Sequence, residues 1–182
     1  MSIVLVGSSS GSITLQEPAV AGTTVLNLPA TSGTVLTTGS TFASTGPAFS
    51  AYAATNQTVT NATATKVNFG TEEFDTNNNF ASSRFTPTVA GYYQINSAIN
   101  CSHTSMVDFV SWIYKNGGQY KRGFGFTGTG PSKFIGQACG LVYLNGTTDF
   151  VEIYIFSNGS GSATINASSQ DTWFDGTLVK AA

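Results

Sequence analysis

The chain has 182 residues and a formal net charge of −2, and only 9% of its residues are charged against 41% that are hydrophobic. Seven Lys and Arg residues are too few to neutralise a nucleic-acid backbone, and an aromatic content of 12% excludes a disordered charged tail. No run approaches the roughly 18 apolar residues of a membrane span. We therefore expect one ordinary domain, or a domain with an arm, without nucleic-acid binding or membrane insertion.

The first seven residues lack the basic start and the longer apolar run of a secretory signal. We therefore expect the mature chain to begin near Met1 and to be made in a cytosol. In that compartment Cys101 and Cys139 would stay reduced, although a disulfide between them is left open. The Asn-x-Ser/Thr triplets are then a by-product of Asn/Thr-rich composition and not glycan sites.

The leading segment, residues 1–45, has almost no charge, and no charged residue lies between Glu17 and Lys66. Aliphatic and β-branched runs broken by Gly and Pro predict short strands at 12–15, 24–28 and 33–37. These runs carry too little apolar bulk for a core of their own, so we expect an anchoring arm that is buried against its own copies or a partner. A flexible Ser/Thr-rich linker is the alternative. The candidate anchor residues are Ile13, Leu15, Val25, Leu26, Leu28, Val35 and Leu36.

The remainder, residues 46–182, holds 12 of the 13 Phe, all seven Tyr and both Trp. Runs typical of strands lie at 48–52, 66–69, 83–87, 91–99, 108–114, 119–122, 136–144, 149–156 and 172–179. No window has the periodicity of an amphipathic helix. Asn-Gly pairs predict tight turns at 116–117, 145–146 and 158–159. The pattern predicts an all-β sandwich, jelly roll or barrel, with a glycine-rich surface loop at 123–136.

Few side chains suggest chemistry. The cluster of Glu72, Glu73 and Asp75 among asparagines could bind Ca²⁺ through oxygen ligands, although a solvated turn is the simpler interpretation. His103 follows Cys101 closely but has no third ligand nearby, so we interpret it as an exposed or hydrogen-bonded loop residue. No pair of carboxylates or nucleophile with a base is evident, and we expect neither an enzyme nor a required cofactor.

One basic and aromatic group could form a contact site for a receptor. A charge pair that protects an edge strand from aggregation is an equal interpretation. The residues concerned are Tyr120, Lys121, Arg122 and Phe124.

The order of segments in residues 47–180 resembles the globular head domain of complement C1q, which shares the jelly roll of the tumour necrosis factor superfamily. The segments that carry the resemblance are Pro47–Tyr52, Arg84–Gln94, Trp112–Gly117, Val142–Asn145, Asp149–Ile153 and Phe174–Val179. The resemblance implies a ten-strand jelly roll that forms a compact homotrimer. It departs from secreted relatives because neither a signal nor a collagen stalk is present.

Large apolar side chains in these strands are candidates for the intersheet core or a trimer seam. In the run 149–156 the residues on both alternating faces are largely apolar. A strand with one face in water would have polar residues on that face, so we expect a trimer seam to cover it, with a monomeric sandwich whose second face is hydrophobic as the alternative. Tyr92 and Tyr93 are neighbours and must point to opposite faces of one strand. The candidates for interface or core are Tyr92, Tyr93, Trp112, Tyr114, Phe150, Ile153 and Phe174.

Residues 11–37 are similar to short β-rich segments near the ends of tailed-bacteriophage fibre and other virion proteins. That resemblance implies a virion surface protein, made in the bacterial host cytoplasm, with a trimeric knob held by its arm. Its partners would be capsid or tail proteins, as a capsid decoration, head fibre or short tail fibre, and a host glycan or protein. A soluble C1q-like or lectin-like binding module is the alternative, and a fibre-borne depolymerase would need a carboxylate pair.

Overall fold

A computed structural model describes residues 2–6, 9, 12–16, 22, 46–128 and 132–182. The chain forms two units, which are taken separately. In the first, β1 (Ser2–Val6) and β2 (Ser12–Gln16) pair antiparallel, with Ile13 opposite Leu5 and Leu15 opposite Ile3. The strand predicted at 12–15 is therefore confirmed. The runs predicted at 24–28 and 33–37, with the anchor candidates Val25, Leu26, Leu28, Val35 and Leu36, lie outside the described residues.

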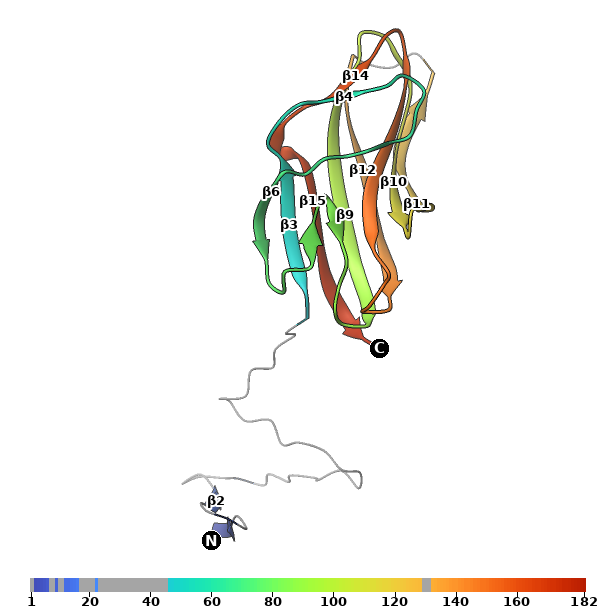
Figure 1. The fold of residues 1–182 in the computed structure, drawn as a ribbon. Coiled ribbons are helices and arrows are strands. Elements are labelled where there is room, and N and C mark those ends of the chain that lie inside the picture. The colour runs from blue at the N-terminus through green and yellow to red at the C-terminus, as the bar shows by residue number, and fades with distance from the viewer. Residues whose placement is uncertain (1, 7–8, 10–11, 17–21, 23–45, 129–131) are drawn as a thin grey trace. The chain divides into compact units, whose positions relative to one another are not determined.

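The second unit, called the body below, is all-β in its described residues, and its long strands run lengthwise (Figure 1). Its strands are β3 (Ala48–Ala53), β4 (Gln57–Val59), β5 (Thr65–Lys66), β6 (Thr71–Asp75), β7 (Phe80–Ala81), β8 (Arg84–Phe85), β9 (Gly91–Ser102), β10 (Met106–Lys115), β11 (Gly118–Thr127), β12 (Lys133–Leu144), β13 (Val151–Gly159), β14 (Ala163–Ile165) and β15 (Ser168–Ala181). None of the described segments forms a helix with the length and hydropathy of a membrane span.

Each of the nine predicted strand runs overlaps a strand of the body. Three other expectations were wrong. The acidic cluster at 72–75 is not a solvated turn but edge strand β6, in which Phe74 pairs with Ser50. The turn predicted at 158–159 lies inside β13, and most of the loop predicted at 123–136 belongs to β11 and β12.

The glycines of β11 predicted a flexible loop, but in the structure they allow strands to pack closely. A side chain at Gly125 would collide with the carbonyl oxygen of Phe109, and one at Gly123 with that of Gln137. Glycine is therefore required where backbones approach closely, between β11 and β10 at Gly125 and between β11 and β12 at Gly123. The same composition that suggests flexibility arises here from a tight strand contact.

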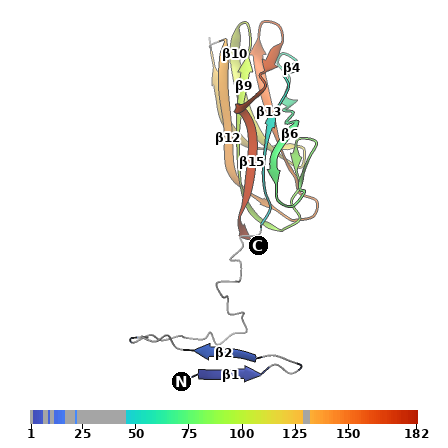
Figure 2. The same ribbon diagram turned by 90° about the vertical axis from the view of Figure 1, so that its left-hand side faces the viewer.

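The body is a sandwich of two sheets. The six-stranded sheet has the order β11-β10-β13-β8-β7, with β5 paired to β13. The seven-stranded sheet has the order β4-β14-β9-β15-β3-β6, with β12 paired to β9. Figure 2 shows β9, β12 and β15 running along one side of the body.

Aromatic rings fill much of the space between the sheets. Phe49 stacks on Phe80 and Phe85 with ring centroids 4.9 and 4.4 Å apart, and Phe174 meets it edge-on at 4.8 Å. Three of the interface or core candidates, Tyr93, Ile153 and Phe174, are fully buried in this core. Rings in these geometries add to the free energy gained from their buried area.

The outer face of the six-stranded sheet holds two more candidates, Trp112 and Tyr114. Tyr114 stacks on Tyr154 of β13 at 3.9 Å, and Trp112 lies edge-on to Phe156 at 6.4 Å. These side chains lie side by side on the outer face, where Tyr114 is buried and Trp112, Tyr154 and Phe156 are half-buried.

Both ends of the body's chain emerge at one end of the sandwich (Figures 1 and 2). The Leu178 N–H donates to the Pro47 carbonyl oxygen at 3.1 Å, and the Ala182 N–H donates to that of Ala90 at 3.0 Å. Strands β4 and β14 lie toward the opposite end. The body thus has an end where the chain enters and leaves, and a far end formed by loops.

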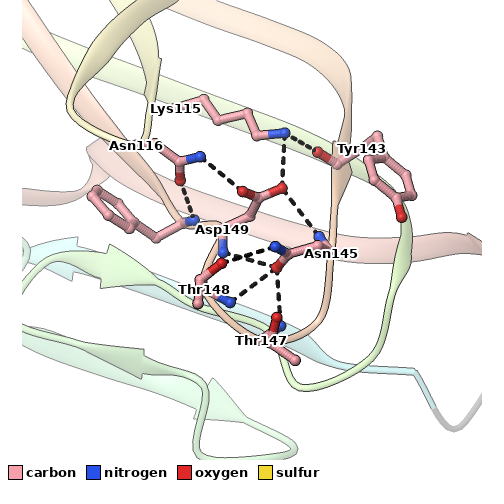
Figure 3. Close-up of polar contacts among 8 residues, drawn as sticks. Lys115, Asn116, Tyr143, Asn145, Thr147, Thr148 and Asp149 are labelled. Atoms are coloured by element: carbon pink, nitrogen blue, oxygen red, sulfur yellow. Dashed lines mark hydrogen bonds and ion pairs between the residues drawn. The ribbon is translucent and has the colours of Figure 1, made fainter.

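A group of polar side chains joins two turns at the entry end (Figure 3). Asn116 and Gly117 have φ angles of 53° and 80°, the type I′ turn that Asn-Gly predicts. Asp149 accepts from Asn116 at 2.7 Å and pairs with Lys115 at 2.9 Å. Asn145 caps the next turn, its Oδ1 accepting from the N–H groups of residues 147–149 at 2.9–3.0 Å.

We expect Asp149→Asn to lower the free energy of unfolding at pH 7 by about 1–2 kcal/mol, since it removes a charged partner of Lys115. The hydrogen bond from Asn116, and then the one from Lys115, hold the pKa of the Asp149 carboxyl below its usual range. The carboxylate therefore stabilises the fold above its unfolded pKa, and this contribution disappears as the pH falls through the lower folded value. Urea unfolding of the unaltered chain and the variant at pH 7 and pH 3 measures the loss of stability and its pH dependence. If the two proteins differed in the free energy of unfolding by the same amount at both pH values, the account would be contradicted.

Candidate assembly face

The outer face of the seven-stranded sheet carries an unusual share of exposed apolar side chains. Strand pairing places directly opposite residues on one face, and one such row runs Phe74, Ser50, Asp175, Asn96 and Cys139 across β6, β3, β15, β9 and β12. Alternate residues of each strand extend this face along the body. We call this outer surface the assembly face.

In the described part of the chain, nine large hydrophobic side chains are exposed, and six of them lie on the assembly face. The six come from four strands, with Phe74 on edge strand β6 and the other five on β9, β12 and β15. They are Phe74, Tyr92, Ile135, Leu141, Tyr143 and Val179. The remaining three, Val107, Tyr120 and Phe124, lie on β10 and β11 of the other sheet.

Tyr92 and Tyr93 confirm the expected division of their strand between two faces. Tyr93 is fully buried, and its hydroxyl donates to the Val89 carbonyl oxygen at 2.6 Å. Tyr92 is exposed on the assembly face, where its ring lies 5.4 Å from that of Tyr143. Among the seven interface or core candidates, Tyr92 alone lies on this face.

A polar ladder crosses the middle of the assembly face. The Gln94 side-chain amide donates to the Asn96 Oδ1 at 2.9 Å, and the Asn96 amide donates to the Asp175 carboxylate at 2.9 Å. On the neighbouring strand pair the Ser50 hydroxyl donates to Glu73 at 2.6 Å. These polar groups have partners within the chain, so covering the face would leave few of them without a hydrogen bond.

A hollow of about 340 Å³ opens on the assembly face beside Phe74. Ala48, Ser50, Asp175 and Thr177 contribute to its lining. Apart from the Asp175 carboxylate the lining is uncharged, which suits an apolar or hydroxyl-bearing side chain of a neighbouring copy that covers the face. The face therefore offers both protruding rings and a recess.

The other sequence candidates do not form one site. Phe150 lies before β13 with the Arg84 guanidinium 3.8 Å from its ring centroid. The receptor-contact candidates lie along β11: Trp112 is opposite Arg122, and Tyr120 has the Lys121 Nζ 5.5 Å from its ring centroid. Phe124, 66% exposed, stacks on Phe134 of β12 at 5.8 Å.

The remaining chemical candidates take structural roles. His103 is buried, its Nε2 lying 3.2 Å from the Gly161 carbonyl oxygen and its Nδ1 accepting from the Ser105 N–H at 3.3 Å. Cys101 is buried and Cys139 exposed, and they do not pair. Burial raises the pKa of the Cys101 thiol to about 11. Within the described residues no three His, Cys, Asp or Glu side chains gather as a metal site, so the proposed Ca²⁺ has no such cluster there.

Solved structures establish the fold. The globular domain of zebrafish complement 1qA protein aligns with a TM-score of 0.54 at 18% identity, covering 75% of this chain and 99% of that one. Murine APRIL at pH 5.0 aligns with a TM-score of 0.57 at 11% identity, covering 74% of this chain and 99% of that one. No protein-family model and no curated protein sequence matches the chain. The body therefore has the predicted C1q/tumour-necrosis-factor-like jelly roll.

We expect Asp175→Asn to raise the melting temperature at pH 7 by a few degrees. Burial, with a smaller contribution from Glu73, raises the pKa of the Asp175 carboxyl, against the hydrogen bond from Asn96. The folded chain thus holds this proton more tightly than the unfolded chain, so stability is lost as the pH rises through the folded pKa. Asparagine keeps the acceptor and removes the charge. Thermal unfolding at pH 7 and pH 4 tests this, and a lower melting temperature for the variant at pH 7 would contradict it.

Proposed function

We propose that the chain is a structural protein that assembles as a homotrimer through the assembly face and stands as a knob on the surface of a larger particle. One observation carries the proposal: six exposed large apolar side chains share one sheet face. Such a surface on a soluble body marks an interaction site. Burying it against copies of the same chain removes apolar area from water at roughly 25 cal/mol per Å².

The trimer is favoured over other closed assemblies by the jelly roll itself, since the resemblance to C1q and tumour necrosis factor relatives implies three copies. A heterologous contact repeated by a three-fold axis closes without leaving an open surface. The exposed apolar groups of the β11 edge, Tyr120 and Phe124, are available to a neighbouring copy as well. Three identical sites on one knob would also raise the avidity of weak adhesion.

Attachment through residues 1–45 is supported by the direction of the body's chain. Pro47 enters at the end where β15 finishes, so the far end of the knob is left for contacts with a host surface. The resemblance of residues 11–37 to tailed-phage virion segments favours a phage particle, as a capsid decoration, head fibre or short tail fibre. The location we propose is the virion surface.

A soluble C1q-like or lectin-like binding module is the second candidate, favoured by the likeness to the zebrafish complement 1qA domain. The two functions share the fold and the trimer and differ in attachment. Co-purification with virions separates them, because a soluble module would remain in the supernatant.

Leu141→Lys tests the trimer. Leu141 is 48% exposed on the assembly face, and a lysine there would bring three charges into an apolar interface. At micromolar concentration the unaltered chain should sediment as a trimer and the variant as a monomer. Val107→Lys is the matched control, since Val107 is 38% exposed but lies on the other sheet. A monomeric unaltered chain, or a trimeric Leu141→Lys variant, would sink the proposal.

Deletion of residues 1–45 tests attachment. The truncated chain should keep its trimer, because the assembly face lies wholly in the body, and should be lost from purified virions. Mass spectrometry of virions grown with either form gives the copy ratio. Equal incorporation of both forms would refute the anchor.

A further inference from the structure

A second hollow, of about 470 Å³, lies on the opposite side of the sandwich, over the outer face of the six-stranded sheet. Its volume falls within the roughly 300–1,000 Å³ typical of small-molecule sites. Two cationic side chains and several hydroxyl and amide side chains contribute to its lining: Lys66, Arg84, Asn78, Ser82, Thr86 and Thr88. No carboxylate is among its lining residues.

The cations are held by one buried carboxylate. Glu152, with a side chain only 3% exposed, accepts from the Lys66 Nζ at 2.7 Å and from the Arg84 Nε at 2.9 Å on the same oxygen. Two positive charges against one negative charge leave a net positive charge at the hollow. The arrangement is rigid because the Glu152 carboxylate is buried. If either Lys66 or Arg84 moved away, a buried negative charge would be left with only one cationic partner.

Arg84 is oriented before any ligand arrives. Its Nε is fixed on Glu152, and its guanidinium carbon lies 3.8 Å from the centroid of the Phe150 ring. Within the described residues, its side chain donates hydrogen bonds through Nε alone. The terminal N–H groups of a guanidinium form a planar fork that matches a carboxylate, and this side chain is 44% exposed.

The turn between β7 and β8 places a hydroxyl at the same hollow. Ser82 and Ser83 have φ angles of 51° and 57°, where glycine or asparagine is usual. Ser83 offsets this strain through its buried hydroxyl, which accepts from the Phe69 N–H at 2.8 Å. Ser82 is exposed and lines the hollow, and no such bond involves its side chain among the described residues. The two angles are those of a type I′ turn, which the two-residue hairpin between β7 and β8 requires.

We propose that this hollow binds a carboxylate-bearing sugar unit of an acidic polysaccharide. The carboxylate would lie on the Arg84 fork, and the sugar hydroxyls would exchange hydrogen bonds with Asn78, Ser82, Thr86 and Thr88. A wall rich in hydroxyl and amide groups suits a polyol better than an apolar ligand. The site requires neither the trimer nor the particle, so it stands apart from the proposed function.

The test is NMR titration of the full chain with D-glucuronate, with glucose as the uncharged control and glucose 6-phosphate as the phosphate arm. We expect glucuronate to shift amide resonances of residues 78–88 with millimolar affinity, and glucose to bind at least about tenfold more weakly. If glucose 6-phosphate bound more tightly than glucuronate, the assignment of a carboxylate ligand would be wrong. If glucose bound as tightly as glucuronate, recognition of the ligand through its charge would be wrong.

Three variants locate the site. Arg84→Lys keeps a charge but loses the fork, and we expect about tenfold weaker glucuronate binding. Lys133→Gln removes an exposed cation of β12 that does not line the hollow, and it should leave binding unchanged. Ser82→Gly removes the lining hydroxyl but relieves the positive φ, so it should raise the melting temperature while weakening binding about twofold to threefold. Unchanged affinity in Arg84→Lys and Ser82→Gly would refute the site.

Discussion

The central constraint on this body is that its seven-stranded sheet exposes large apolar side chains on its outer face in addition to packing its inner face into the core. The inner face is covered by the six-stranded sheet through packed rings around Phe49 and Phe174. The outer face has no cover within the described body, and it exposes Phe74, Leu141 and Val179. A surface of this kind favours association in water. Because the polar groups at its centre already have partners within the chain, covering the face would leave few of them without a hydrogen bond.

The scarcity of charge follows from the same constraint. Of the few charged groups, Glu152 with Lys66 and Arg84, and Asp149 with Lys115, serve as internal links on the other sheet and at the entry end. On the assembly face, Asp175 lies in the central row, where burial already raises its pKa. Thr, Ser and Asn then supply the wetted surface elsewhere. The two proposals use separate faces, so the assembly and the anionic ligand do not compete.

The sequence predicted the fold well where alternation and bulk were clear. The long runs at 91–99, 108–114 and 172–179 became β9, β10 and β15, and the Asn116-Gly117 turn formed as expected. It misled where one composition has two physical causes. Glycine marks a loop or a close backbone approach, and β11 has the latter. Acidic residues mark a turn or an edge strand, and Glu72 and Glu73 belong to β6.

The assembly face was harder to foresee, because it joins alternate residues from strands that are distant in the chain. Tyr92 could be assigned to an outer face from its neighbour alone, but Phe74 on β6 and Leu141 on β12 can be assigned to the same face only from the strand order. The hollow around Arg84 was invisible for the same reason, since Lys66, Arg84 and Glu152 meet from three strands.

The reactivity of Cys139 tests the assembly face most directly. Its thiol is exposed in the single copy on β12, an edge strand of that face, whereas Cys101 is buried in the core. The rate of Cys139 modification by a thiol reagent should fall as protein concentration rises through the trimerisation range, and it should stay high in the Leu141→Lys variant. A rate that is independent of concentration while the chain sediments as a trimer would contradict the account, because the copies would then meet through another surface.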